Sequence, residues 1–321
     1  MRVEILEQAN SIYRDAFQIT AYAFGSGEKS LCIVGATRGN EYQQLYVCTK
    51  LVEILHQFEN EGRLDPDKEI MVIPSCNPYS MNIGKRFWPI DNTDINRMFP
   101  GYDKGETTQR IADTIFKCVQ QYPINIQLTS YYMPGVFLPH VQIMQTTMDY
   151  RDMAEDFDVP YVLIRKPRPY DTTTLNYNLQ IWNCKAFSLY TTTTDTLDLE
   201  SAQDGVDCVL SFMARQDMLM DYGVTEHVHD ILYEEQDVIP VRTQQAGFFI
   251  PKVDASDMVR TGDVMAVIEN TTTGAVLEEI RAPCNGIVFF LHSSPLVYSH
   301  TAAIKIIRDQ NSWPDYMLDK K

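Results

Sequence analysis

The chain has 321 residues, of which 45% are hydrophobic and 22% charged, so it is long enough for a large core and a second domain. Its formal net charge of −16 opposes contact with phosphate backbones, and we expect no nucleic-acid partner. The seven dispersed cysteines form no C-x-x-C pair, which indicates reduced thiols and a cytoplasmic protein. We also expect no membrane association, because the sequence shows neither a secretory leader nor an apolar run of membrane-spanning length.

Apolar runs and amphipathic segments alternate along the first part of the chain. Such alternation is typical of an α/β fold with a mostly parallel mixed sheet flanked by helices. In a sheet of this kind, functional loops follow the carboxyl ends of the strands. The pattern predicts strands at residues 31–35, 70–74, 124–128, 161–164 and 186–190, and helices at 41–58 and 107–119.

The pattern changes after about residue 220. From Val238 onward the stretches are short and alternating, with turn signals such as Asn285-Gly286. This pattern predicts a small all-β, barrel-like C-terminal domain. The expected division of the chain is therefore an α/β domain at 1–220, a linker at 221–237, a β domain at 238–309 and a tail at 310–321.

One short segment, residues 94–101, suits the binding of a small carboxylate. It places Asn96 and Arg97 side by side before a Pro-Gly turn. The arginine side chain is a planar, permanently charged fork that matches a carboxylate with two hydrogen bonds, and asparagine adds a neutral donor. A second glycine-flanked segment, residues 35–41, follows the first predicted strand.

Together these two segments resemble the succinylglutamate desuccinylase/aspartoacylase family of zinc hydrolases, which are relatives of the zinc carboxypeptidases. The resemblance implies a carboxypeptidase-like α/β domain and hydrolysis of N-acyl amino acids. Residues 258–268 and 281–288 look like the biotinyl/lipoyl-type barrel that recurs as the C-terminal domain of this family. No lysine lies in a turn between matching hairpin strands, so we expect no lipoyl or biotinyl attachment.

The resemblance also shows where this chain departs from the family. The family takes two zinc ligands from an H-x-x-E segment, and here Glu41 matches the acid while Arg38 replaces the histidine. Thr129 stands at the position of the third ligand, a histidine, and Tyr190 at that of the general-base glutamate. A guanidinium has no lone pair to offer a metal. We therefore expect no cofactor, and we expect Arg38 to pair with Glu41 and supply the charge that zinc would have supplied.

The substrate-binding residues of the family are retained. Asn96 and Arg97 match its carboxylate-binding pair, and Arg86 matches the arginine that steadies the oxyanion. The expected ligand is accordingly a small carboxylate or an N-acyl amino acid. Plainer interpretations of Asn96, Arg97 and Glu41 are also open. Asn96 and Arg97 fit a turn with a structural salt bridge, and Glu41 fits the start of a helix, where the dipole favours a carboxylate.

Histidines elsewhere in the chain are candidates for replacement ligands. His140 follows Thr129 closely enough to point back toward Glu41, which makes zinc held by Glu41 and His140 the alternative to a metal-free site. His227 and His229 form an H-x-H pair that fits a solvated linker better than a metal site.

Three functions follow from this sequence. The first is a catalytically impaired relative that binds a carboxylate, and the second is an active amidohydrolase with a rebuilt metal site. The third is a zinc-independent enzyme that uses Tyr190 or Glu41 as an acid or base. Members of the family often form oligomers, so the resemblance is also consistent with a homo-oligomer.

Overall fold

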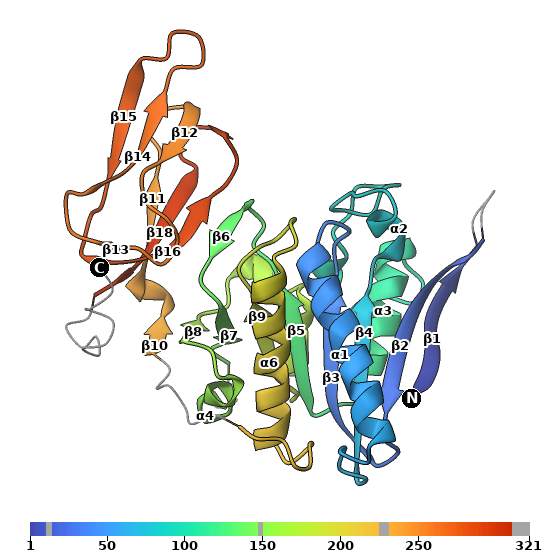
Figure 1. Ribbon diagram of the computed structural model, residues 1–321. Helices are drawn as coiled ribbons and strands as arrows, with labels where there is room; N and C mark the ends of the chain where they lie inside the picture. Colours follow the sequence, from blue (N-terminus) through green and yellow to red (C-terminus); the bar gives the residue numbers. More distant parts are fainter. Residues whose placement is uncertain (11–14, 147–149, 225–230, 310–321) are drawn as a thin grey trace. The chain divides into compact units, whose positions relative to one another are not determined.

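The computed structural model describes residues 1–10, 15–146, 150–224 and 231–309 (Figure 1). The predicted tail at 310–321 and the pair His227 and His229 lie outside the described residues. The chain divides into two compact units. The first is formed by Met1–Ser130 and Pro139–Leu232, and the second by Tyr131–Leu138 and Tyr233–Lys321.

The first unit is built on a nine-stranded mixed sheet. Strands β4, β3, β5 and β9 run parallel to one another, as do β7 and β8, whereas the pairs β1–β2, β2–β4 and β7–β9 are antiparallel. In spatial order the strands are β1 (Arg2–Ala9), β2 (Phe17–Phe24), β4 (Lys68–Ser75), β3 (Glu28–Ala36), β5 (Ile124–Thr129), β9 (Lys185–Tyr190), β7 (His140–Met144), β8 (Tyr161–Arg165) and β10 (Ile231–Glu234).

Helices cover both faces of this sheet, which confirms the predicted α/β architecture. One face packs against α1 (Tyr42–Asn60), α4 (Arg151–Ala154) and α6 (Leu199–Arg215). The other packs against α3 (Thr107–Val119) and α5 (Leu175–Ile181). The remaining helical turns are α2 (Pro78–Met81), η1 (Ile95–Arg97), η2 (Glu155–Phe157), η3 (Pro169–Asp171) and η4 (Glu235–Asp237). None of the helices in the described ranges has the length and apolar character that crossing a bilayer requires.

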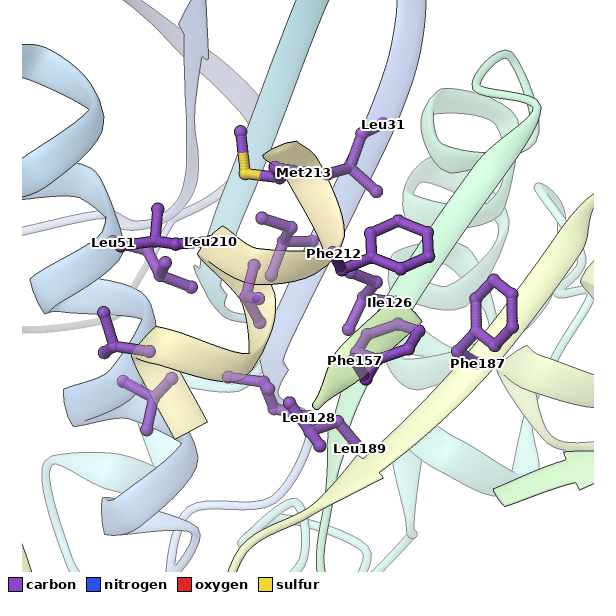
Figure 2. Close-up of a cluster of buried hydrophobic side chains, with 14 of the residues drawn as sticks. Leu31, Leu51, Ile126, Leu128, Phe157, Phe187, Leu189, Leu210, Phe212 and Met213 are labelled. Atoms are coloured by element: carbon purple, nitrogen blue, oxygen red, sulfur yellow. The ribbon is translucent and has the colours of Figure 1, made fainter. Parts of the chain in front are cut away.

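The core beneath α1 and α6 is apolar throughout (Figure 2). Leu51 of α1 and Leu210 of α6 are buried there with Leu128 of β5. Phe157 stacks on Phe212, with ring centroids 4.2 Å apart. Full burial of each such side chain stabilises the folded state by about 1.5–3 kcal/mol, so this apolar layer holds the helices against the sheet.

The opposite face of the central strands is polar where it approaches their carboxyl ends. Side chains alternate between faces along a strand, so Gln127 of β5 points away from the apolar core. The strand register sets Gln127 beside Ser188 of β9, and Ser188 beside Gln142 of β7. Asn176 of α5 donates from Nδ2 to Ser188 Oγ at 2.8 Å. The polar layer therefore lies under the edge where a functional site is expected.

The second unit consists of antiparallel sheets. One has the order β11 (Val238–Arg242), β18 (Ala302–Arg308), β16 (Gly286–His292) and β13 (Met258–Val259), with β6 (Gly135–Phe137) also paired to β16. The other has the order β15 (Val276–Arg281), β14 (Val264–Glu269), β12 (Gly247–Pro251) and β17 (Leu296–Val297). Their shared core includes Phe249, Ile268, Val288, Ile304 and Ile306.

Two details differ from the expected domain division. The expected first domain, 1–220, includes residues 131–138, whereas in the structure these residues belong to the second unit because β6 pairs with β16 and Leu138 N donates to Phe289 O. The segment expected as a linker, residues 221–237, contains the regular elements β10 and η4.

Candidate functional site

The residues singled out in the sequence gather around the carboxyl ends of β3, β5 and β9. These three strands are parallel, so their ends share one edge of the sheet. The loop of residues 37–41 leaves β3 at this edge, and Ser130 follows β5 there. Tyr190 is the last residue of β9, in register with Thr129.

The carboxylate of Glu41 is buried and accepts five hydrogen bonds. Its Oε2 accepts from the Thr37 amide at 2.8 Å, from Thr37 Oγ1 at 3.2 Å and from the Arg38 amide at 3.0 Å. Its Oε1 accepts from Ser130 Oγ at 2.6 Å and from Arg38 Nη1 at 3.0 Å. Both oxygens are thus bound within the protein, as burial of a charged group requires.

Arg38 lies between two carboxylates. Its Nη1 pairs with Glu41, while Nη2 and Nε contact Asp94 Oδ2 at 3.0 and 3.1 Å. Burial lowers the pKa of Arg38, but the negative charges of Glu41 and Asp94 outweigh burial and raise the pKa above its ordinary value. The predicted ion pair with Glu41 is therefore present. The second partner, Asp94, was not predicted.

Arg86 is held next to this pair by a close backbone approach. The Gly39 amide donates to the Arg86 carbonyl at 3.1 Å. A Cβ at Gly39 would lie 2.3 Å from the carbonyl oxygen of Lys85, so only glycine fits there. Arg86 is half-buried, and burial, followed by the charge of Arg38, lowers its pKa. A guanidinium nevertheless stays protonated at neutral pH.

Asn96 and Arg97 lie in η1 and contact the segment before β9. The buried Asn96 accepts from the Leu175 amide at 3.2 Å through Oδ1, and this leaves its amide hydrogens as the part able to contact an acid. Arg97 donates from Nη1 to the Tyr170 carbonyl at 2.6 Å. Asp94 fixes the turn by accepting from the Asn96 amide at 3.0 Å.

Thr129, Tyr190 and His140 form one row across β5, β9 and β7. Thr129 Oγ1 donates to the Gln127 carbonyl at 3.1 Å. His140 is fully buried and stacks on Tyr190. Burial raises the pKa of Tyr190, partly offset by the charges of Arg165 and Arg38. The phenol therefore stays protonated at neutral pH and is a poor base.

The residues at the family's metal-ligand positions do not fit a zinc ion. Arg38 has no lone pair, both oxygens of Glu41 are occupied, and the hydroxyl of Thr129 is bonded to a carbonyl. In the part of the chain that the structure describes, no three His, Cys, Asp or Glu side chains are grouped to hold a metal.

Three groups that complete this site are not apparent from the sequence. Thr37 and Ser130 bind Glu41, and Asp94 binds Arg38. Asp94 stands two residues before Asn96, a spacing typical of an Asx turn. That signal locates the turn but not its ionic partner, because 56 residues separate Asp94 from Arg38.

A family model described as the succinylglutamate desuccinylase/aspartoacylase catalytic domain matches residues 27–189. Among curated proteins, the N-alpha-acetyl-L-2,4-diaminobutyric acid deacetylase of Halomonas elongata is 30% identical over 95 residues. That match spans 30% of this chain and only 26% of the relative's length.

Solved structures share the fold at low sequence identity. A succinylglutamate desuccinylase from Silicibacter sp. has a TM-score of 0.78 at 16% identity, with 92% of this chain and 90% of that chain covered. A succinylglutamate desuccinylase/aspartoacylase from Rhodobacter sphaeroides has a TM-score of 0.77 at 18% identity, covering 93% and 91%. The product-bound ectoine utilization protein EutE of Ruegeria pomeroyi has a TM-score of 0.76 at 18% identity, covering 91% and 89%.

Proposed function

Because the chain belongs to the succinylglutamate desuccinylase/aspartoacylase family, we propose that it is a metal-free, catalytically impaired member that binds a small carboxylate or an N-acyl amino acid. The observation that carries this proposal is the position of Arg38 between Glu41 and Asp94. A fixed guanidinium supplies positive charge at the site and leaves Glu41 no oxygen for another cation.

Among the described residues, neither Tyr190 nor Glu41 is available as a base. Burial keeps the Tyr190 phenol protonated, and five donors engage the Glu41 carboxylate. A general base must be able to accept a proton from the attacking water. This arrangement disfavours both metal-assisted hydrolysis and an acid–base mechanism through these two residues.

The groups that would hold a ligand are retained. Arg97 and the amide hydrogens of Asn96 would bind the carboxylate of the ligand, and Arg86 would contact its acyl oxygen. Guanidinium and amide donors favour an anion at this position. The deacetylase relative is named for an N-acetylated amino acid, which supports N-acyl amino acids as the ligand class.

The opposing function is an active amidohydrolase with zinc held by Glu41 and His140. Purification of the full chain without chelator, followed by metal analysis, separates the two. We expect substoichiometric zinc, no release of acid from N-acetyl amino acids by NMR, and calorimetric binding of the same compounds. Stoichiometric zinc together with turnover would overturn the proposal.

Substitution of Arg97 tests its role in binding the ligand. Arg97→Gln should weaken binding of N-acetyl amino acids at least about tenfold, because one charge-assisted hydrogen-bond pair is lost. Arg110→Gln, which changes an exposed arginine on α3, is the matched control and should bind like the unchanged protein. Equal binding by both variants would contradict the role of Arg97.

A further inference from the structure

The strand β1 forms one edge of the nine-stranded sheet (Figure 1). Among the described residues, no strand pairs with its outer side, so that side presents backbone N–H and C=O groups that the sheet leaves unused. Proteins ordinarily protect such an edge with a bulge, a proline or charged side chains. A bulge is present here, because the register of β1 with β2 shifts between Ile5 and Glu7. The residues before this bulge, 1–5, therefore remain as a regular edge that is able to pair.

The side chains of this edge segment differ between its two faces. Val3 and Ile5 point to one face and are 56% and 54% exposed. Val3 lies opposite Tyr22 of β2, which packs against the core beneath α1 and α6, whereas Val3 and Ile5 themselves stay uncovered. The other face carries Arg2 and Glu4, with 2.8 Å between Nε and Oε1. The segment thus has one apolar face and one charged face.

The sequence of this segment is complementary to itself in the antiparallel direction. When two copies pair with Val3 opposite Val3, each Arg2 lies opposite the partner's Glu4, and each Ile5 lies opposite the partner's Met1. Apolar side chains then meet on one face and opposite charges meet on the other, and both kinds of cross-strand pair stabilise a sheet. Such a pairing has a twofold axis, as most homodimers do.

Other registers are less favourable. A pairing centred on Glu4 sets two like charges directly opposite each other, which destabilises a sheet. One centred on Ile5 runs into the bulge that follows this residue. A pairing centred between two residues would match side chains that point to opposite faces, which the pleat of a sheet excludes. The register centred on Val3 is therefore the one that this edge can use.

We propose that two copies of this chain associate through β1, so that one sheet continues from the first unit of one copy into that of the other. Val3 lies at the centre of the contact, and an ion pair between Arg2 and the partner's Glu4 lies on either side. Addition of a strand to an exposed sheet edge is a recurring mode of protein association. The inference goes beyond the proposed function and does not depend on it, because β1 carries none of the residues of the candidate site.

Analytical ultracentrifugation of the full chain tests this association. At about 0.15 M salt a Debye length of about 8 Å screens much of the repulsion between two copies of net charge −16. One strand pair is a small contact, so we expect a dimer at about 200 µM that dissociates toward about 1 µM. Val3→Lys sets two lysines opposite each other and should weaken association at least about tenfold. Val276→Lys changes a valine that is 57% exposed on β15, an edge strand of the second unit, and this control should associate like the unchanged chain.

Exchange of the two charges tests the register. Arg2→Glu and Glu4→Arg should each be monomeric alone, because like charges then face each other, whereas an equal mixture of the two should form a mixed dimer. Thermal unfolding checks that the variants fold, since Arg2 also pairs with Glu69. Where Arg2→Glu does not fold, loss of association in Glu4→Arg decides the outcome.

Two results would overturn the proposal. One is an unchanged chain that stays monomeric at every concentration, and the other is a dimer that survives Val3→Lys. Folded charge variants that do not associate when mixed would overturn the register centred on Val3. A dimer that is lost in Val3→Lys, kept in Val276→Lys and restored in the mixture supports the pairing of β1 with a second copy.

Discussion

The imidazole of His140 lies flat against the phenol of Tyr190, with ring centroids 4.4 Å apart and planes within 6°. The two residues face each other across the antiparallel strands β7 and β9. Both had been singled out in the sequence for chemistry, His140 as a replacement ligand and Tyr190 at the general-base position. Their stacking gives them a common role in packing the edge of the sheet beneath the site.

Truncation of His140 should therefore destabilise the fold. His140→Ala removes a fully buried ring and leaves a cavity beside Tyr190, at a cost of about 2–4 kcal/mol in the free energy of unfolding. Urea denaturation measures this loss. His56→Ala on the exposed side of α1 is the control and should change stability by less than about 0.5 kcal/mol. A stable His140→Ala protein with reduced metal content would favour the ligand role instead.

Arg38→Met should destabilise the protein by about 3–5 kcal/mol, because Glu41 and Asp94 would be left without their common cation. Thermal and urea unfolding measure the effect. Arg38→Lys keeps the charge but cannot bridge two carboxylates as a planar fork, so we expect an intermediate loss. Stability equal to that of the unchanged protein would remove the basis for Arg38 as a built-in cation.

Glu69 should make stability depend on pH. Burial raises the pKa of Glu69, but hydrogen bonds from Arg2 and Tyr122 outweigh burial and hold the pKa below its usual value. A lowered folded-state pKa stabilises the protein above the unfolded value of about 4.3, and this stability is lost as pH falls through the folded-state pKa. Glu69→Gln should therefore be less stable than the unchanged protein at pH 7, with the gap closing below about pH 4.

Urea unfolding of both proteins between pH 3 and pH 7 tests this prediction. Glu53→Gln changes a largely exposed carboxylate on α1 and should show no such gap. A gap of constant size at every pH would mean that Glu69 acts through packing rather than charge.

Burial should protect four of the cysteines from thiol reagents in the folded protein. Burial raises the pKa of the Cys32, Cys48 and Cys76 thiols well above the usual range, and that of Cys118 to about 11. The thiolate is the reactive form, so these thiols should resist a disulfide reagent at pH 8 in the folded protein. All seven cysteines, which lie in the described residues and form no disulfide, should react once the protein is unfolded. Fewer than seven in unfolded, unreduced protein would contradict the structure.

Much of the first unit could be predicted from the sequence. The parallel strands β3 and β4 are buried over most of their length and read as continuous apolar runs, and α1 and α3 each carry a clear apolar stripe. The strands β1 and β2 contain no long apolar run, because charged or polar residues interrupt both and no residue of β1 is buried, so apolar runs alone do not predict them. The strand β7, which begins at His140, is absent from the predicted strands, because Leu138-Pro139 directly before it interrupts the apolar pattern.

The candidate site was only partly predictable. Arg38 and Glu41 are three residues apart, so their ion pair follows from local sequence. The contacts of Asp94 with Arg38 and of Ser130 with Glu41 join segments that only the folded sheet brings together. The contact of Arg97 with the Tyr170 carbonyl likewise joins two turns that are far apart in the sequence, so spacing alone could not predict it.

The strand β6 affects how this protein can be divided and synthesised. Residues 135–137 pair with residues 290–292, so about 150 residues are translated between the two partners. A gene truncated after residue 232 would produce the first unit together with residues 131–138. In that product Phe137 would lack the sheet that buries it. Recombinant expression of either half alone should consequently require moving residues 131–138 to the other half through a circular permutation or a graft.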